Sequence, residues 1–412
     1  MSKTNDLAPL WKFAEVSPTS PEFAKLTCND EVTFIPLEDV WPTHTAENFQ
    51  TVDWETRLTG YTPFRRGDLL LPKVTPTVTH GRTMIADITT NLGVASTEVY
   101  TVRPRPSTDP RWLAYALVET EFLELAGASV QGTGGLKRIS TQFVESYPLP
   151  NAATDEQRAI ADYLDRETAE IDGMRADLDE MERLLTERRV SIVQRHVLPK
   201  DGTYTRIKLV AEVTLGKTVQ KTQTDSSEVL RNYVRAAHIQ PHGRLTLDDQ
   251  PMWFTPNELK QLTLEAGDVL VVEGGAGYGR STYLHEDLPE WGFQNHVIRV
   301  RPLGGASGRF IDYTIRAHYG AGLIDILADG ATIPGLSSDK ARELPILNIS
   351  NVEQRRIADK IDRETIEIDS MLEDITKLRN LLAERRAALI SAAVTGQIDI
   401  PASPTHKDEA HA

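Results

Sequence analysis

The sequence predicts a mixed α+β protein, in which two α/β domains are separated by two long antiparallel coiled-coil helices. Three observations support this fold class. The chain has 412 residues, which is too long for one compact core. It contains an internal repeat with a period near 200 residues, which indicates a pseudo-twofold arrangement. Each copy of the repeat ends in a Pro-free segment of helical hydrophobic periodicity.

The composition is that of an ordinary folded protein. Apolar residues make up 40% of the chain and charged residues 25%, which excludes a disordered or collagen-like chain. The single cysteine, Cys28, cannot form an internal disulfide. The longest apolar runs, such as Leu69–Pro72, are far shorter than the ~20 residues that span a bilayer. We therefore expect a cytoplasmic protein without a membrane partner.

The first domain is expected over residues 1–153 and the second over residues 198–350. Their match is weaker than that of the helices and is confined to short segments. Gly67–Leu70 corresponds to Gly267–Leu270, and Val102–Pro104 corresponds to Val300–Pro302. Two domains of similar fold and divergent surface are expected to do the same kind of task on different targets.

The helices are expected over residues 154–197 and 351–396. Glu156–Val197 and Glu353–Val394 align without a gap and are identical at 21 of 42 positions. Apolar side chains recur at spacings of three and four, as in a coiled-coil seam. The predicted seam consists of Ile160, Leu164, Ile171, Met174, Leu178, Met181, Leu185 and Ile192, and of Ile357, Ile361, Ile368, Met371, Ile375, Leu378, Leu382 and Leu389. The alternative is that these segments are simply long helices of the domain cores.

Charged residues interrupt this seam at matching places, Glu167 and Glu364 in one case and Arg188 and Arg385 in the other. Because a buried charge is costly unless it is paired, these residues are expected to fix the register of the helices or to contact a third helix.

Capping signals mark where the helices begin. Thr154 with Gln157, and Asn351 with Gln354, have the spacing of a capping box. The tail, residues 397–412, is expected to be disordered.

The repeated pattern Glu-Gln-Arg-x-Ile-Ala-x-x-[Leu/Ile]-Asp resembles the conserved regions of type I restriction–modification specificity subunits. So do the loop Gly330–Ser337, the segments Phe34–Glu38 and Tyr233–Ala237, and the Gly267–Leu270 turn leading to Gly277–Arg280. The resemblance extends from Phe34 to Gln397. The first half departs from it at Gly132–Leu136, where a different glycine-rich sequence precedes Lys137 and Arg138.

This resemblance implies that each domain is a target recognition domain that reads one half of a split DNA sequence. It implies that the helices separate the half-sites and dock two methyltransferase subunits. Those subunits would hold S-adenosylmethionine, so no cofactor is expected in this chain. A restriction/translocase subunit can join the complex.

Motifs for catalysis within the chain are weak. No Asn/Asp-Pro-Pro-aromatic turn of an amino-methyltransferase occurs, and Gly274–Gly279 lacks the spacing of a dinucleotide loop. Leu215–Thr218 ends like a phosphate loop but lacks its first glycine. Glu258 and Lys260 have the Glu-x-Lys spacing of a metal-dependent nuclease, although this segment also fits the start of a helix. His238 and His242 have no further ligands for zinc. We therefore expect neither catalytic residues nor a metal site.

Cations beside small polar residues are the candidates for DNA contact. Lys and Arg bind phosphates, whereas Arg, Asn, Gln, Ser and Thr also read base edges. The candidates are Arg65, Arg66, Lys73, Arg82, Lys137 and Arg138 in the first domain, and Lys217, Lys221, Arg231, Arg235 and Arg280 in the second. For each of them, an ordinary surface charge is the alternative.

The sequence thus predicts a non-catalytic DNA-recognition subunit with a bipartite, asymmetric target. Its half-sites are expected to lie about 34–36 Å apart, or one turn of DNA. The net charge of −15 predicts weak DNA binding by the isolated chain. The alternatives are a coiled-coil scaffold that binds other proteins and, third, a fused methyltransferase or nuclease.

Overall fold

We describe residues 6–130, 137–275, 277–327 and 335–400 of a computed structural model of the chain. The chain divides into two compact units, which are described separately. Unit 1 comprises Met1–Leu178 and Lys377–Ala412, and unit 2 comprises Asp179–Thr376. Each of the two long helices, α4 (Thr154–Val197) and α9 (Asn351–Val394), is therefore divided between the units. The loop residues Gly132–Leu136 and Gly330–Pro334, and the tail from Pro401, lie outside the described residues.

Unit 1 contains two four-stranded sheets and one strand pair. The first sheet has the order β2-β9-β6-β7 and the second the order β4-β3-β8-β5, in which β3 and β8 are parallel. The elements are β1 (Leu7–Pro9), β2 (Ala14–Val16), β3 (Glu31–Ile35), β4 (Gln50–Asp53), β5 (Thr62–Arg65), β6 (Leu69–Pro72), β7 (Met84–Ile85), β8 (Leu92–Ala95), β9 (Val99–Pro104), β10 (Pro148–Pro150), α1 (Pro110–Ala116), α2 (Thr120–Ser129) and α3 (Thr141–Ser146). β1 pairs with β10 just before α4 begins.

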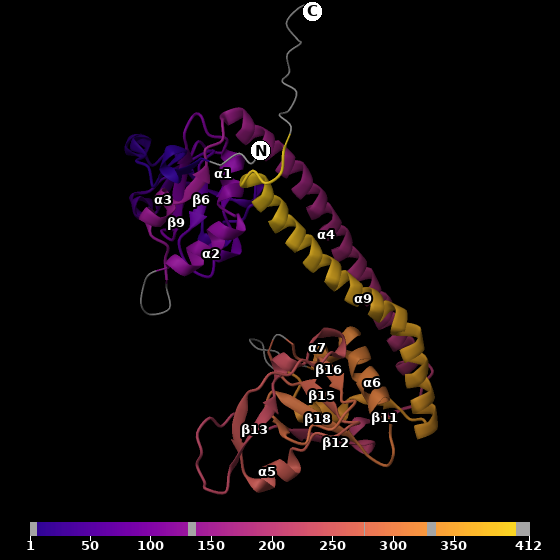
Figure 1. Ribbon diagram of the computed structural model, residues 1–412. Coiled ribbons are helices and arrows are strands. Elements are labelled where there is room, and N and C mark those ends of the chain that lie inside the picture. The colour runs from indigo at the N-terminus through magenta and orange to yellow at the C-terminus, as the bar shows by residue number, and fades with distance from the viewer. Residues whose placement is uncertain (1–5, 131–136, 276, 328–334, 401–412) are drawn as a thin grey trace, which may run out of the picture. The chain divides into compact units, whose positions relative to one another are not determined.

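Unit 2 repeats this plan. Its sheets have the orders β12-β18-β15-β16 and β14-β13-β17, with β13 and β17 parallel, and β11 pairs with β19. The elements are β11 (Tyr204–Arg206), β12 (Ala211–Leu215), β13 (Val229–Val234), β14 (Pro251–Phe254), β15 (Val269–Val272), β16 (Ser281–Tyr283), β17 (Trp291–Phe293), β18 (Val297–Pro302), β19 (Pro345–Leu347), α5 (Pro256–Gln261), α6 (Gly308–Gly320), α7 (Leu323–Leu327) and α8 (Ser338–Glu343). Figure 1 shows α6 beside the sheet of β15, β16 and β18.

The match between Gly67–Leu70 and Gly267–Leu270 has a structural basis. Gly67 and Gly267 adopt φ values of +87° and +101° at the turns that enter β6 and β15, a conformation that favours glycine. The next residues, Asp68 and Asp268, are buried and each binds an arginine of the neighbouring strand. The turn and its ion pair therefore explain why this motif occurs twice.

The long helices complete the core of each unit. In unit 1, Ile160 and Leu164 of α4 share one hydrophobic cluster with Ile390 and Val394 of α9 and with the sheet. In unit 2, a corresponding cluster includes Val193 and Val197 of α4 and Ala358 and Ile361 of α9. The two helices therefore pack together in both units, as predicted, and at the same time form part of the domain cores, as in the alternative.

The two helices are antiparallel within each unit. In unit 1, Asp172 accepts a hydrogen bond from Arg386 at 2.8 Å, while Leu164 packs with Ile390. In unit 2, Arg189 binds Asp369, while His196, further along α4, binds Glu364, further back in α9. Asp172 and Asp369 are equivalent in the repeat, and so are Arg189 and Arg386. The same cross-helix ion pair therefore occurs once in each unit.

The expected capping box at the start of α4 is not formed. Thr154 lies inside the helix, and its hydroxyl donates to the carbonyl of Ser107 at 2.7 Å. Gln157 is buried, and its side-chain oxygen accepts from the Asp109 backbone N–H at 2.9 Å. The Gln157 side chain thus accepts a hydrogen bond from the residue that caps α1, and it does not cap α4 itself.

The capping box predicted at the start of α9 is not formed either. Ser350, one residue before the predicted cap, accepts a hydrogen bond from the Glu353 N–H at 3.3 Å, and Asn351 is the first helical residue. Gln354 is buried and accepts from the Ser307 N–H, at the start of α6. Both glutamines therefore join the long helix to the N-terminus of an earlier helix, α1 in unit 1 and α6 in unit 2.

The chain continues to pack beyond α9. Ile398 and Ile400 are partly buried against the core of unit 1, and the N–H of Gln397 donates to the Ala392 carbonyl at 2.8 Å. The disorder predicted from residue 397 onward is therefore not observed over Gln397–Ile400, because two apolar side chains anchor this segment.

Candidate nucleic-acid interface

Three of the predicted cations of unit 1 come together around one turn. The turn consists of Ser96, Thr97 and Glu98 and joins β8 to β9. Arg138 forms two hydrogen bonds to the Glu98 carboxylate, at 2.7 and 2.6 Å, and Lys73 donates to the Thr97 carbonyl at 2.8 Å. We call Lys73, Lys137 and Arg138 the cationic edge of unit 1.

Backbone contacts position this edge. The Thr75 N–H donates to the Lys137 carbonyl at 3.0 Å, and Val74 forms an isolated bridge with Arg138. The side chain of Lys137 is exposed. Burial lowers the pKa of Lys73, and the hydrogen bond from Arg138 lowers the pKa of Glu98. Arg138 and Lys73 are thus held by the turn, and the exposed Lys137 beside them is the cation of this edge that is left for a phosphate.

The other three predicted cations of unit 1 hold their own chain together. Arg65 forms an ion pair with Glu22. Arg66 donates to the Thr89 and Thr90 carbonyls. Their charges therefore join loops that are distant in the sequence.

Arg82 is fixed in a similar way. It donates to the carbonyls of Leu37 and Val40, at 2.9 and 3.0 Å, and its guanidinium lies 4.1 Å from the centre of the Trp41 ring. Burial lowers the pKa of Arg82. This side chain is thus committed to the packing of the 37–41 segment.

Acidic partners also bind the predicted cations of unit 2. Lys217 is largely buried and donates to Glu258 at 2.6 Å. Glu258 also accepts from the Thr255 N–H in a capping box at the start of α5, so the Glu258–Lys260 motif is a helix start.

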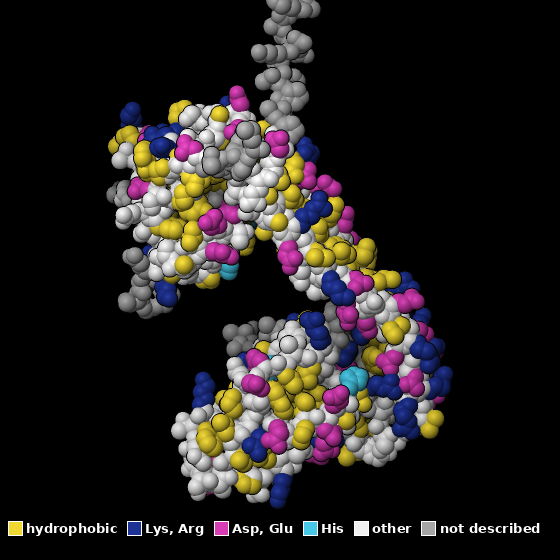
Figure 2. All heavy atoms as spheres, viewed as in Figure 1, with side chains coloured by type: hydrophobic (Ala, Val, Ile, Leu, Met, Phe, Trp, Pro, Cys, Tyr) yellow, Lys and Arg dark blue, Asp and Glu magenta, His cyan; other side chains and the backbone are white. Residues whose placement is uncertain are grey.

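Arg231 and Arg235 are paired as well. Arg231 binds Glu290 and Arg235 binds Asp248, each at 2.6 Å. His238 contacts the same Asp248 at 2.8 Å. On the face shown in Figure 2, basic and acidic side chains likewise intermingle over the surface.

Lys221 and Arg280 have no ion pair among the residues that the structure describes. Lys221 is exposed on the 216–227 loop, whose end is held by Glu228. Glu228 accepts hydrogen bonds from the N–H groups of Thr224 and Asp225 and from Gln220, which lower its pKa to about 2. Arg280 is partly exposed and follows β15. These two cations are thus available to an anionic ligand.

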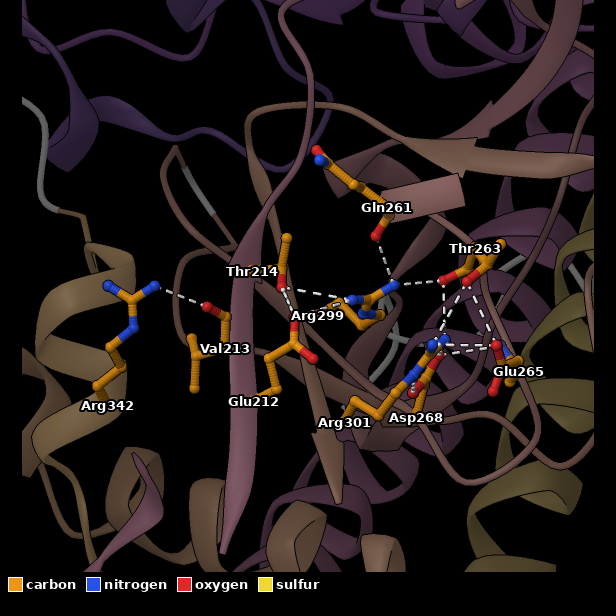
Figure 3. A network of polar contacts seen from close by, with 10 residues as sticks. All are labelled: Glu212, Val213, Thr214, Gln261, Thr263, Glu265, Asp268, Arg299, Arg301 and Arg342. Atoms are coloured by element: carbon orange, nitrogen blue, oxygen red, sulfur yellow. Dashed lines mark hydrogen bonds and ion pairs between the residues drawn. The ribbon is translucent and has the colours of Figure 1, made fainter. Parts of the chain in front are cut away.

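Buried arginines of unit 2 serve the fold and not a ligand. Arg299 donates to the backbone carbonyls of Gln261 and Thr263, and Arg301 binds Asp268 and Glu265 (Figure 3). Arg301 and Asp268 correspond to Arg103 and Asp68 of unit 1, which form the same pair. These charges lie inside the sheet layer and leave few donors for a partner.

The predicted seam of the long helices is wrong in its central part. Four predicted seam residues, Met174, Met181, Met371 and Leu378, are between 38% and 50% exposed, and Leu184 and Leu381, which lay outside the predicted seam, are 52% and 58% exposed. In the same part of the helices Ile171, Ile368, Leu372 and Ile375 are buried. A straight α-helix repeats every 3.6 residues, so a strict 3.5-residue seam drifts away from the partner.

The exposed residues form three pairs of repeat equivalents: Met174 with Met371, Met181 with Leu378, and Leu184 with Leu381. Met174, Leu378 and Leu381 belong to unit 1, and Met371, Met181 and Leu184 belong to unit 2. We call these six residues, three in each unit, the apolar helix surface. The hydrophobic spacing alone did not distinguish them from the seam.

The charged residues expected to fix the register are also displaced by one position. Arg188 and Arg385 are exposed, whereas the neighbouring Arg189 and Arg386 bind the opposite helix. Glu364 does contact the other helix, through Arg195 and His196, but Glu167 binds Arg166 of its own helix. The register thus depends on arginine–aspartate pairs beside the predicted positions.

Two further features bear on function. Within the described ranges there is no group of three or more His, Cys, Asp or Glu residues that could hold a metal ion. No helix in the same ranges is both long and apolar enough to cross a bilayer.

Known proteins with similar sequences are type I restriction enzyme specificity subunits of Escherichia coli. The EcoEI subunit is 25% identical over 150 residues, which cover 36% of this chain and 25% of that protein. The EcoAI subunit is 27% identical over 157 residues, or 37% of this chain and 26% of that protein. The matched part thus spans about a quarter of the length of these relatives. No protein-family model matches the chain.

The fold has a close counterpart among solved structures. A chain from a study of complex assembly and conformational transition of the type I restriction–modification system aligns over 95% of this chain and 98% of its own length. The TM-score is 0.68 and the sequence identity 14%. The mixed α+β fold with two paired long helices is therefore confirmed, and the expected resemblance to type I specificity subunits is confirmed in sequence and in fold.

Proposed function

We propose that this chain is the non-catalytic DNA-specificity subunit of a type I restriction–modification complex. Each unit reads one half of a bipartite, asymmetric target. The observation that carries the proposal is the duplication of one sheet plan, β2-β9-β6-β7 and β12-β18-β15-β16, with different side chains at its surface. Two readers of one fold but unlike surfaces fit two unlike half-sites.

The partners in this proposal are double-stranded DNA and two methyltransferase subunits, which hold S-adenosylmethionine. The apolar helix surface supports two copies of one partner, because its residues occur as three pairs of repeat equivalents. Exposed Met and Leu side chains on a helix suit docking of another apolar helix. A restriction/translocase subunit can join this complex. We also propose that the protein is located in the cytoplasm, where its DNA target lies.

The helix pair is proposed to set the spacer between the half-sites. Repeated arginine–aspartate pairs and shared apolar clusters join α4 to α9 in both units. A helix pair held in this way is stiff, and its length in residues determines its length in space at about 1.5 Å per residue.

Methylome sequencing tests the proposal. A methylation-free strain that carries the partner methyltransferase gene is sequenced with and without the gene for this chain. We expect one bipartite, asymmetric motif to be modified only when this chain is present. An identical methylome in both strains contradicts the proposal.

The second candidate is a scaffold that binds proteins through the two units. One observation favours it: most of the predicted DNA-binding cations are paired with acidic groups or carbonyls of their own chain. If the chain is a scaffold, it would still bind its partner protein, and no methylation motif would depend on it.

A further inference from the structure

The turn between β8 and β9 has a counterpart in unit 2. In unit 1 the Ser96 N–H donates to the Ile35 carbonyl at 3.1 Å, and the Val99 N–H donates to the Ser96 carbonyl at 3.2 Å. A third hydrogen bond, of 2.8 Å, runs from the Lys73 N–H to the Glu98 carbonyl. These bonds involve only the backbone, so they fix the turn whatever side chains it carries.

The turn between β17 and β18 of unit 2 is built by the same three bonds. The Gln294 N–H donates to the Val234 carbonyl at 3.1 Å, and the Val297 N–H to the Gln294 carbonyl at 2.9 Å. The Glu273 N–H donates to the His296 carbonyl at 2.9 Å. In both units the turn follows the strand that pairs in parallel, so the two turns occupy equivalent places in the fold.

Additional contacts hold the unit 2 turn. The Asn295 N–H donates to the Lys217 carbonyl at 2.8 Å. A Cβ atom at Gly216 would lie 2.2 Å from the Gln294 carbonyl oxygen, so only glycine allows this close approach. The turn is therefore rigid, which a side chain needs in order to discriminate between bases.

The side chains on these equivalent frames differ. Unit 1 presents Ser96, Thr97 and Glu98, whereas unit 2 presents Gln294, Asn295 and His296. Gln294 and Asn295 are partly exposed, and their amides have no hydrogen-bond partner among the described residues. An unpaired amide can form two hydrogen bonds to the N6 and N7 positions of adenine.

The surroundings of the turns suit DNA. In unit 1 the cationic edge surrounds the turn, with Arg138 on Glu98 and Lys73 on the Thr97 carbonyl. In unit 2 two backbone hydrogen bonds join the turn to Lys217: the Lys217 N–H donates to the Phe293 carbonyl, and the Asn295 N–H donates to the Lys217 carbonyl. The exposed Lys137 can bind a phosphate while the unit 1 turn contacts base edges, whereas Lys217 is held by Glu258 and helps to position the unit 2 turn.

We propose that these two turns are specificity-determining elements, and that Gln294 and Asn295 read bases in one half-site while Ser96 and Thr97 read bases in the other. This inference rests on the proposed function. It explains the asymmetry of the target at two positions where the backbone is the same and only the hydrogen-bonding groups differ.

The test uses the assembled complex with its methyltransferase subunits. In one variant, Gln294→Ser and Asn295→Thr together give unit 2 the unit 1 side chains at these two positions, while His296, whose ring lies 3.3 Å from the Glu273 carboxylate, is kept. In another, Ser96→Gln and Thr97→Asn change unit 1. We expect each variant to alter the methylated bases of one half-site, a different half-site in the two cases, with the other half and the spacer retained. Unchanged half-sites in both variants overturn the inference.

Single substitutions cover the case in which a combined variant loses all methylation. Gln294→Ala and Asn295→Ala leave the backbone bonds in place, so the complex should assemble. Binding to a library of altered half-sites should show about 5- to 150-fold lower discrimination at the base that is read. Equal losses at every position, or no loss, overturn the inference.

The matched control is Asn348→Ala, an exposed amide just before α9, which should leave both half-sites unchanged. If the wild-type complex itself shows no motif that depends on this chain, the proposed function fails. If it shows one that the turn variants do not change, only the present inference fails.

Discussion

The basic residues named above fall into two groups at the scale of single residues. Arg103, Arg299 and Arg301 lie within the sheets and bind carboxylates or carbonyls of their own unit. Lys137, Lys221 and Arg280 face outward and have no ion pair in the described part of the chain. The charge that holds the fold is thus separate from the charge that is available to a ligand.

The buried Asp268 pair gives the first prediction. Asp268 is 1% exposed and accepts two hydrogen bonds of 2.7 Å from Arg301. Asp268→Asn removes the buried counter-charge of this arginine and leaves only the exposed Glu265, so unit 2 should lose about 3 kcal/mol of unfolding free energy, measured in urea. Asp68→Asn should act similarly on unit 1. An unchanged midpoint would show that the pair adds little, and the exposed Asp225→Asn serves as the control.

A buried histidine predicts how stability depends on pH. His318 is 3% exposed, and its Nε2–H donates to the Pro345 carbonyl at 2.6 Å. Burial lowers its pKa below the ordinary value of 6.5. The unfolded chain therefore binds the proton more readily, and the stability contributed by neutral His318 is complete above pH 6.5 and is lost as the pH falls toward the lowered pKa.

The measurement is the unfolding midpoint between pH 8 and pH 5 of the wild type and of His318→Gln, which keeps a donor toward Pro345. The wild type should lose more stability than the variant over this range. Parallel pH profiles would mean that other groups dominate.

The sequence indicated candidate cations for DNA contact but not the partners that these cations have within the chain. Arg65, Arg138 and Lys217 were predicted to contact DNA, yet each binds a glutamate that lies about 40 residues away in the sequence. No local pattern indicates such a pair, because the fold brings the partners together. The turns at Ser96 and Gln294 were missed for the same reason, since only the strand pairing shows them to be equivalent.

At the scale of elements, the position of the long helices was predictable and their register was not. Both begin at the expected residues, Thr154 and Asn351, because the hydrophobic pattern is long and free of proline. One apolar period, however, cannot distinguish the seam within the chain from the apolar helix surface. The distinction depends on cross-helix pairs such as Arg189 with Asp369.

This pair yields a prediction about the helices. Arg189→Glu alone places two carboxylates together, and the loss of charged hydrogen bonds should cost about 1.5–3 kcal/mol of unfolding free energy. Adding Asp369→Arg should restore most of that stability. Arg386 with Asp172, the equivalent pair, should respond in the same way to its own exchange. Urea unfolding of the single and double variants measures the coupling, and a double variant no better than the sum of its parts would refute it.

The apolar helix surface yields a prediction about assembly. Leu184 and Leu381 are 52% and 58% exposed, so a change to glutamate should leave the fold intact. Each single variant, Leu184→Glu or Leu381→Glu, should bind one methyltransferase subunit, and the double variant should bind none, because a charge would be buried at each contact. Native mass spectrometry of the complex gives the stoichiometry. Two bound subunits in the double variant would exclude this surface, and Leu209→Glu, 69% exposed and outside the long helices, is the control.

At the scale of the whole molecule, the proposed function predicts that the length of the helices sets the spacing of the target. The ion-pairing residues are Asp172 and Arg189 in α4 and Asp369 and Arg386 in α9. An insertion that preserves both pairs must therefore lie between these residues in both helices and must have the same length in each.

A heptad inserted between Glu180 and Met181, together with one between Lys377 and Leu378, meets these conditions, since both points lie halfway between the ion-pairing residues. Seven residues add about 10.5 Å of helix, and DNA rises about 3.4 Å per base pair. The spacer of the methylated motif should therefore lengthen by about 3 base pairs while both half-sites stay the same, as read by methylome sequencing. A heptad in α4 alone moves Asp172 and Arg189 out of register with their partners and should abolish methylation. An unchanged spacer in the doubly extended protein would mean that the helices do not set the distance, and that the methyltransferase subunits position the two readers instead.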